Sequence, residues 1–255
     1  MGREHAVDSV TRDGAALPEY PRLEGENGAV VRHAPHLPLL GREVLAHLET
    51  GLAALPEMLG ISAPALEALV VAGDDWDAAP RDNSRPYPRG LPYFTRATEP
   101  PALVIPERLS GAIQPRTGAT LPLVVHHELA HAFLAGVVAV RIPSWLRELP
   151  PQAASAAVAR REALPLDEHL TRMESPGFTI RGFHTPAAAG EQMAFQNLLL
   201  RLGAAALAGF GEAFLPRLVA ALRRETELDE SRAEDLLAEA LGPGGREWLD
   251  SQEEF

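Results

Sequence analysis

The chain has 255 residues, of which 46% are hydrophobic and 23% are charged, values that are typical of a folded globular protein and exclude wholesale disorder. Its formal net charge of −12, with no local cluster of lysine and arginine, argues against a nucleic-acid partner, because such binding depends on basic side chains that neutralise phosphates. The absence of cysteine excludes disulfides and leaves histidines and carboxylates to hold any metal ion.

The N-terminal residues 1–19 are predicted to form a flexible polar arm, without an apolar run of signal-peptide length. The longest apolar stretch, residues 129–142, is interrupted by Gly136 and Arg141 and is too short to span a membrane. We therefore expect no transmembrane segment and a cytoplasmic location.

The first half of the remaining chain shows strand signals around one helix. Asn27-Gly28 predicts a hairpin turn, with Ala29–His33 as the better strand. One apolar helical face follows, formed by Val44, Leu45, Leu48, Leu52 and Leu55, with Gly60 as its stop. "LEALVVAG" and "PALVIPERL" predict two buried strands, and residues 73–101 between them predict a long loop.

The second half is predicted to be almost entirely helical. Thr120 is expected to cap the helix that carries "VVHHELAHAFL", and further helices are expected near 153–163, 188–202, 212–224 and 231–241. Gly203 is expected to end the second of these, and Ser231 with Glu234 to form a capping box for the last. The fold class is therefore α+β, with one domain over 20–255 that is β-rich to about 118 and helical over 119–255.

The most informative motif is His127-Glu128-Leu129-Ala130-His131, an H-E-x-x-H pattern. On a helix, positions i and i+4 share a face, so both imidazoles can bind one zinc ion while Glu128 deprotonates a water on it. The helix is apolar nearly all round, and a metal site explains why two histidines and a glutamate are placed on it. The alternative is an accidental match in a metal-free interaction domain. His126 is expected to face a neighbouring strand or the rim of a cleft.

A catalytic zinc site needs a third protein ligand. Leu134 and Val137 occupy the positions where the three-histidine version of the motif has glycine and histidine, which excludes that version. Glu148 in "RIPSWLRELPPQAA" is the best candidate, because it follows a helix start at Pro143-Ser144. The other candidates are Glu162, Asp167, Glu168 and His169.

"HHELAHAFL" followed by "IPSWLRE" resembles the gluzincin metallopeptidases of the peptidase-MA-like group, and compatible segments extend over most of the chain from about residue 27. The resemblance implies a zincin-like fold, Zn²⁺ bound by His127, His131 and Glu148, and Glu128 as general base in the hydrolysis of a peptide or protein substrate. It also implies that the strand Ala102–Pro106 lies along the cleft and pairs with an extended substrate.

The chain departs from the pattern of that family after Glu148, where Gly-x-Ala is replaced by Leu149-Pro150-Pro151. Either the second helix begins at Pro150, or it bends there. His184 and His169 are the available residues to stabilise an oxyanion. The alternative function is a catalytically weak or inactive zinc-binding protein with a binding or regulatory role.

Overall fold

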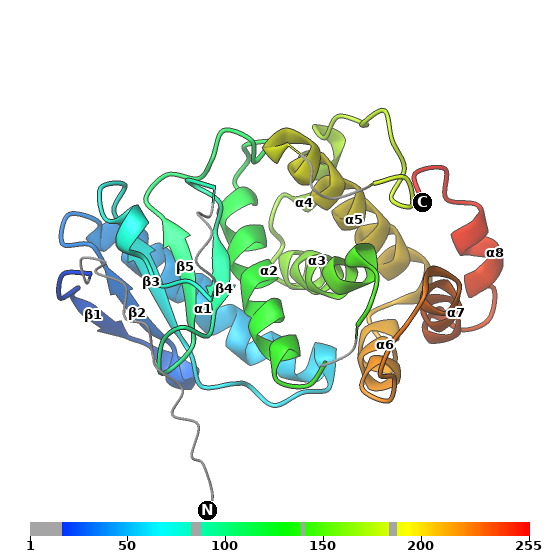
Figure 1. Cartoon of the computed structure of the whole chain (residues 1–255), viewed down its shortest axis with the longest axis horizontal. Helices are drawn as coiled ribbons and strands as arrows, with labels where there is room; N and C mark the ends of the chain where they lie inside the picture. The colour runs from blue at the N-terminus through cyan, green and yellow to red at the C-terminus, as the bar shows by residue number, and fades with distance from the viewer. Residues whose placement is uncertain (1–16, 83–87, 139–140, 184–187) are drawn as a thin grey trace, which may run out of the picture.

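The computed structural model describes residues 17–82, 88–138, 141–183 and 188–255. Within them the fold is α+β, as expected, with a mixed sheet at one end of the molecule and helices filling the other (Figure 1). The strands are β1 (Arg22–Glu24), β2 (Val30–His33), β3 (Glu67–Val71), β4 (Tyr93–Thr95) and β5 (Ala102–Pro106). The helices are α1 (Pro38–Leu59), α2 (Thr120–Ala135), α3 (Ser144–Arg161), α4 (Leu166–Thr171), α5 (Ala189–Phe210), α6 (Phe214–Leu222), α7 (Glu230–Leu241) and α8 (Gly245–Asp250). Most of the expected N-terminal arm, residues 1–16, lies outside the described residues.

The sheet has the order β1-β2-β3-β5-β4, with β2, β3 and β5 parallel and the two outer strands antiparallel to them. The hairpin between β1 and β2 is confirmed, and its turn residues Asn27 and Gly28 have φ values of 54° and 77°, which asparagine and glycine tolerate best. Both faces of the sheet are covered: Ala68 and Val70 face the helices, while Leu69 and Val71 pack with Trp76 on the other side. This explains the unbroken apolar run of β3.

Two parts of the sheet differ from expectation. All five residues of β5 are buried; β3 pairs with the whole strand on one side and β4 pairs with residues 102–104 on the other, so this part of the strand has no free edge for a substrate. The outer strand is β4, inside the stretch expected to be a loop. Its three residues are flanked by Pro92 and a polar turn, and so short a strand leaves no alternating pattern to detect.

Helix α1 supports α2 from behind and ends at Gly60, whose φ of 66° is the left-handed conformation expected at a helix stop. The two helices approach closely at Gly51, because a Cβ there would lie 2.6 Å from a methyl carbon of Leu129. Thr120 is the first residue of α2 rather than its cap, and its hydroxyl accepts a hydrogen bond from the backbone N–H of Thr117.

The helical half contains longer helices than expected. α3 begins at Ser144 and continues through Pro150 and Pro151, so neither proline starts the helix. α5 continues through Gly203, which the sequence suggested as its end. That glycine instead allows α5 to pack on α3, since a Cβ on it would lie 2.9 Å from the Cα of Ala153.

The last helices were located approximately, and α4 and α8 were not expected. The cap of α7 is Asp229, whose carboxylate accepts a hydrogen bond from the backbone N–H of Arg232 at 2.8 Å; the expected Ser231–Glu234 capping box is wrong by register. Among the described residues, one segment, Gly190–Phe210 of α5, is long and apolar enough to span a membrane, with a mean hydropathy of 1.3. Half of it is buried and α5 packs against α3, as core helices do.

Candidate metal centre

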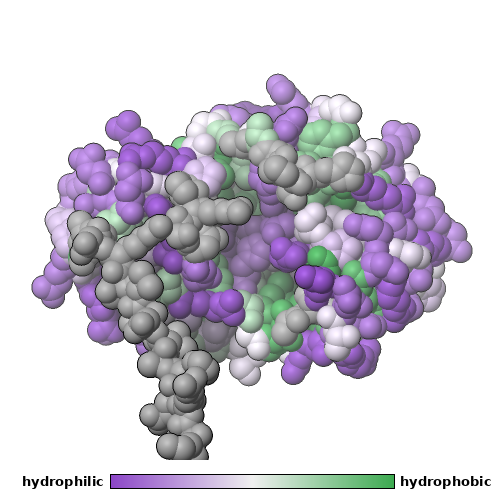
Figure 2. Space-filling model, viewed as in Figure 1, coloured by the Kyte–Doolittle hydropathy of each residue, from purple (hydrophilic) through white to green (hydrophobic). Residues whose placement is uncertain are grey.

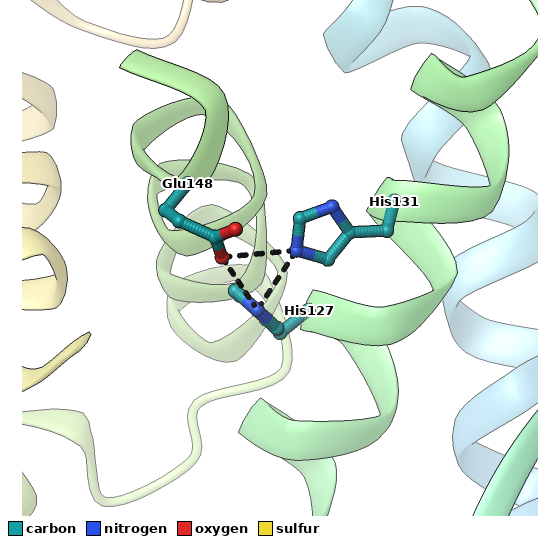
Figure 3. A group of neighbouring side chains, drawn as sticks. All are labelled: His127, His131 and Glu148. Carbon is teal, nitrogen blue, oxygen red and sulfur yellow. Dashed lines mark hydrogen bonds and ion pairs between the residues drawn. The ribbon is translucent and has the colours of Figure 1, made fainter. Parts of the chain in front are cut away.

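The two histidines of the motif project from one face of α2 toward Glu148 on α3 (Figure 3). The Nε2 atoms of His127 and His131 are 3.1 Å apart. The Oε2 atom of Glu148 lies 3.1 Å from Nε2 of His131 and 3.5 Å from Nε2 of His127. All three residues are therefore brought together as the sequence suggested, and the side chains are between 13% and 22% exposed.

This triangle of donor atoms fits a metal ion. Three ligands of a tetrahedral zinc ion, with bonds of about 2.0–2.1 Å, are separated by roughly 3.3 Å, close to the observed spacings. At 3.1 Å the two ring nitrogens can share one proton, or both can direct their lone pairs at one cation. The group His127, His131 and Glu148 can bind a metal ion.

The electrostatics of the group are dominated by Glu148 and His131. Burial opposes ionisation of Glu148, but the charge of His131 and hydrogen bonds from both histidines outweigh it and hold the pKa of Glu148 well below its usual value. For His131, burial and the charge of Arg147 act to lower the pKa, yet the charge and hydrogen bond of Glu148 prevail and raise it to about 9. Glu148 is therefore ionised in the site, and its negative charge favours the binding of a cation.

Glu128 lies beside the ligands without being one of them. Its carboxylate accepts a hydrogen bond from the backbone N–H of Phe94 in β4. Burial raises the pKa of Glu128, although the nearby histidines act in the opposite direction. The strand therefore holds a carboxyl group of raised pKa next to the metal ligands.

The outer edge of β4 has its N–H groups already engaged. Alternate residues of a strand direct their N–H groups to the same edge. The N–H of Phe94 bonds Glu128, that of Arg96 bonds Oδ1 of Asp82 at 2.6 Å, and residue 92 is a proline. A substrate strand would have to displace one of these carboxylates to pair here.

A pocket of about 700 Å³ contains Glu128 and the three ligands. Figure 2 shows it as a hollow in the middle of the molecule, with a hydrophilic floor and hydrophobic surface beside it. The pocket lining combines apolar residues that follow the motif in the chain with amide side chains from the loop before α2 and from α5. The apolar residues are Leu134, Val138, Ile142, Leu146 and Leu222, and the amides are Gln114, Gln192, Gln196 and Asn197.

Two glutamines orient the third ligand. Nε2 of Gln196 on α5 donates to Oε2 of Glu148 at 3.0 Å, and Nε2 of Gln152 donates to Oε1 of Gln196 at 2.7 Å. Sequence reasoning missed both, because an isolated glutamine on an apolar helix carries no motif. The backbone N–H of Phe94 was missed for the same reason.

The competing third ligands lie elsewhere. Glu162, Asp167 and Glu168 are exposed, and Glu168 forms an ion pair with Arg172. His169 lines the same pocket, but its Nδ1 is paired with the hydroxyl of Thr117 at 2.8 Å. His184 lies outside the described residues.

His126 was expected to face a neighbouring strand or the rim of the cleft, and this expectation is wrong. His126 is fully buried against α1, where its Nε2 donates to the carbonyl oxygen of His47 at 3.1 Å and its ring packs edge-on against that of His47. Burial lowers the pKa of His126 to about 4, so the ring stays neutral and stabilises the packing of α2 on α1.

Comparison of the sequence with known proteins did not identify a relative. The sequence matches no protein-family model, and no curated protein matches it. The function must therefore be inferred from the chemistry of the site.

Proposed function

We propose that this protein is a zinc-dependent metallopeptidase of the gluzincin type. His127, His131 and Glu148 would hold the zinc ion, and Glu128 would be the general base. The observation that carries this proposal is the position of Glu128, whose carboxylate shares a pocket with three converging metal ligands and is held by Phe94.

A bound zinc ion supplies Lewis acidity, which lowers the pKa of a water molecule and polarises a carbonyl group. The protein supplies the proton acceptor. Glu128 takes the proton from water and returns it to the departing amine, and its raised pKa suits both directions of transfer. The Phe94 N–H holds the carboxylate in place, and the pocket of about 700 Å³ that contains the ligands can receive part of a peptide.

The ligand set favours zinc. Two imidazoles and one carboxylate, with no thiolate in the chain, form a donor set that is typical of catalytic zinc sites with one position left for water. The hydrogen bonds from Gln196 and Gln152 would fix the carboxylate, as outer partners of metal ligands do.

The decisive experiment measures zinc and cleavage separately. We expect the purified protein to contain one zinc ion, and His127→Ala and His131→Ala to lose it. Glu128→Gln should retain zinc and lose about two to four orders of magnitude in cleavage of a peptide library. Zinc without cleavage in the unmodified protein would favour the non-catalytic binding role, and failure to take up zinc would refute both.

A further inference from the structure

The pocket is lined by five charged groups besides its histidines: Asp82, Arg96, Glu128, Arg147 and Glu148. Its three carboxylates all have partners. Glu148 is bonded by the two histidines and Gln196, and Glu128 by the N–H of Phe94. Asp82 accepts hydrogen bonds from the hydroxyl of Thr95 at 2.8 Å and from the backbone N–H of Arg96.

Among the described residues, the two guanidinium groups of the pocket have no carboxylate partners. In the part of the chain that the structure describes, the side chains of Arg96 and Arg147 form no ion pair with a carboxylate, and Nη2 of Arg147 donates one long hydrogen bond of 3.4 Å to the carbonyl oxygen of Ile142. Arg161, at the other end of α3, is by contrast paired with Glu57 and Glu212. Acidic residues exceed basic ones by 12 in this chain, so carboxylate partners are plentiful elsewhere.

The two arginines line the pocket from different elements of the fold. Arg96 directly follows β4, two residues after Phe94, whose N–H holds Glu128. Arg147 precedes the ligand Glu148 on α3, near enough for its charge to act on His131. Both arginines line the pocket that contains Glu128 and the three ligands, so a peptide residue that enters this pocket next to the metal site can present a carboxylate to them.

An exposed guanidinium costs little in water, and both of these side chains are exposed. A ligand that fills the pocket removes part of that water, and an unpaired charge then becomes unfavourable unless the ligand brings its own anion. We propose that the cleft selects peptides that carry a carboxylate close to the scissile bond, and that Arg96 and Arg147 bind this carboxylate. The inference rests on the proposed function for the peptide nature of the ligand.

This local preference runs against the charge of the whole molecule. The net charge of −12 repels acidic peptides at long range, but such repulsion is screened over about 8 Å at physiological salt. Contacts inside the pocket are less screened, so the two arginines decide selectivity there. The carboxylate can belong to an aspartate or glutamate side chain or to the C-terminus of the peptide.

Binding of fluorescent peptides to the zinc-loaded Glu128→Gln protein, measured by anisotropy, tests the inference without requiring cleavage. Four matched peptides distinguish the two sources: glutamate or glutamine at one position, each with a free or an amidated C-terminus. We expect removal of the recognised carboxylate to weaken binding about tenfold or more. Arg96→Ala or Arg147→Ala should erase that difference, and high salt should reduce it.

Arg42→Ala is the matched control, because Arg42 is exposed on α1 and does not line the pocket; the control should keep the discrimination. Equal binding of charged and neutral peptides, including binding of none, overturns the inference, as does discrimination that survives the double Arg96→Ala, Arg147→Ala variant. Circular dichroism and zinc content verify that each variant is folded and loaded. Discrimination without cleavage by the unmodified protein would refute the peptidase function alone, whereas cleavage without discrimination would refute only the carboxylate preference.

Discussion

Nε2 of Gln196 donates a hydrogen bond to Oε2 of Glu148, the same oxygen that faces both histidines of α2. The two residues are 48 positions apart and are joined because α5 packs on α3. A glutamine from a separate helix therefore directs the carboxylate that completes the metal centre.

Replacement of Gln196 by leucine should weaken zinc binding about 10–100-fold, because the carboxylate of Glu148 loses the donor that orients it. Competition with a zinc-binding dye gives the affinity. Gln192→Leu is the control, since Gln192 lines the same pocket from the same helix but makes no hydrogen bond to Glu148 in the described structure. Equal affinities for the two variants would contradict a positioning role for Gln196.

In the metal-free protein, the imidazole of His131 should titrate near pH 9. Glu148 raises this pKa against the effect of burial, so Glu148→Gln should bring the pKa of His131 below its ordinary value of 6.5. The stabilisation from the pair is complete between pH 4.5 and 6.5, is lost as the pH rises through about 9, and is also lost at lower pH as Glu148 becomes protonated. NMR of the ring protons measures both titrations. His169, whose pKa is lowered by burial, should be unaffected by the substitution.

Glu128→Gln should stabilise the metal-free protein at pH 7. Burial raises the pKa of Glu128 in the folded state, so folding opposes its ionisation once the pH exceeds the ordinary value of 4.5. Glutamine keeps an acceptor for the Phe94 N–H but carries no charge. Urea unfolding should show the gain at pH 7 and its disappearance below about pH 4.5, where both states hold a protonated carboxyl. A gain that is independent of pH would contradict this explanation.

Gly203→Ala should destabilise the protein by about 1–3 kcal/mol, because its Cβ would lie 2.9 Å from the backbone of Ala153 and push α5 away from α3. The same substitution at Gly209, in the same helix but with no atom within 4 Å of the new Cβ, should instead stabilise by about 0.5–1 kcal/mol through helix propensity. Chemical denaturation measures both. Similar changes at the two positions would show that the helix contact is loose.

Local chemistry accounts for what the sequence established. The i, i+4 spacing of His127 and His131 fixes their common face once the segment is helical, and the hairpin at Asn27-Gly28 and the stop at Gly60 follow from backbone preferences. The α+β class followed from the order of strand and helix signals. These features depend on neighbours in the chain, and they were predicted correctly.

The remaining features depend on contacts between distant segments, which periodicity does not encode. Only the packed structure shows that α3 runs through Pro150 and Pro151, so that Glu148 reaches both histidines. The position of β4 at the outer edge of the sheet, where its backbone holds Glu128, could not be recognised from three residues. Helix packing determined the surroundings of the third ligand. Gly203 allows α5 to approach α3 closely, and this close packing brings Gln196 within hydrogen-bond distance of Glu148.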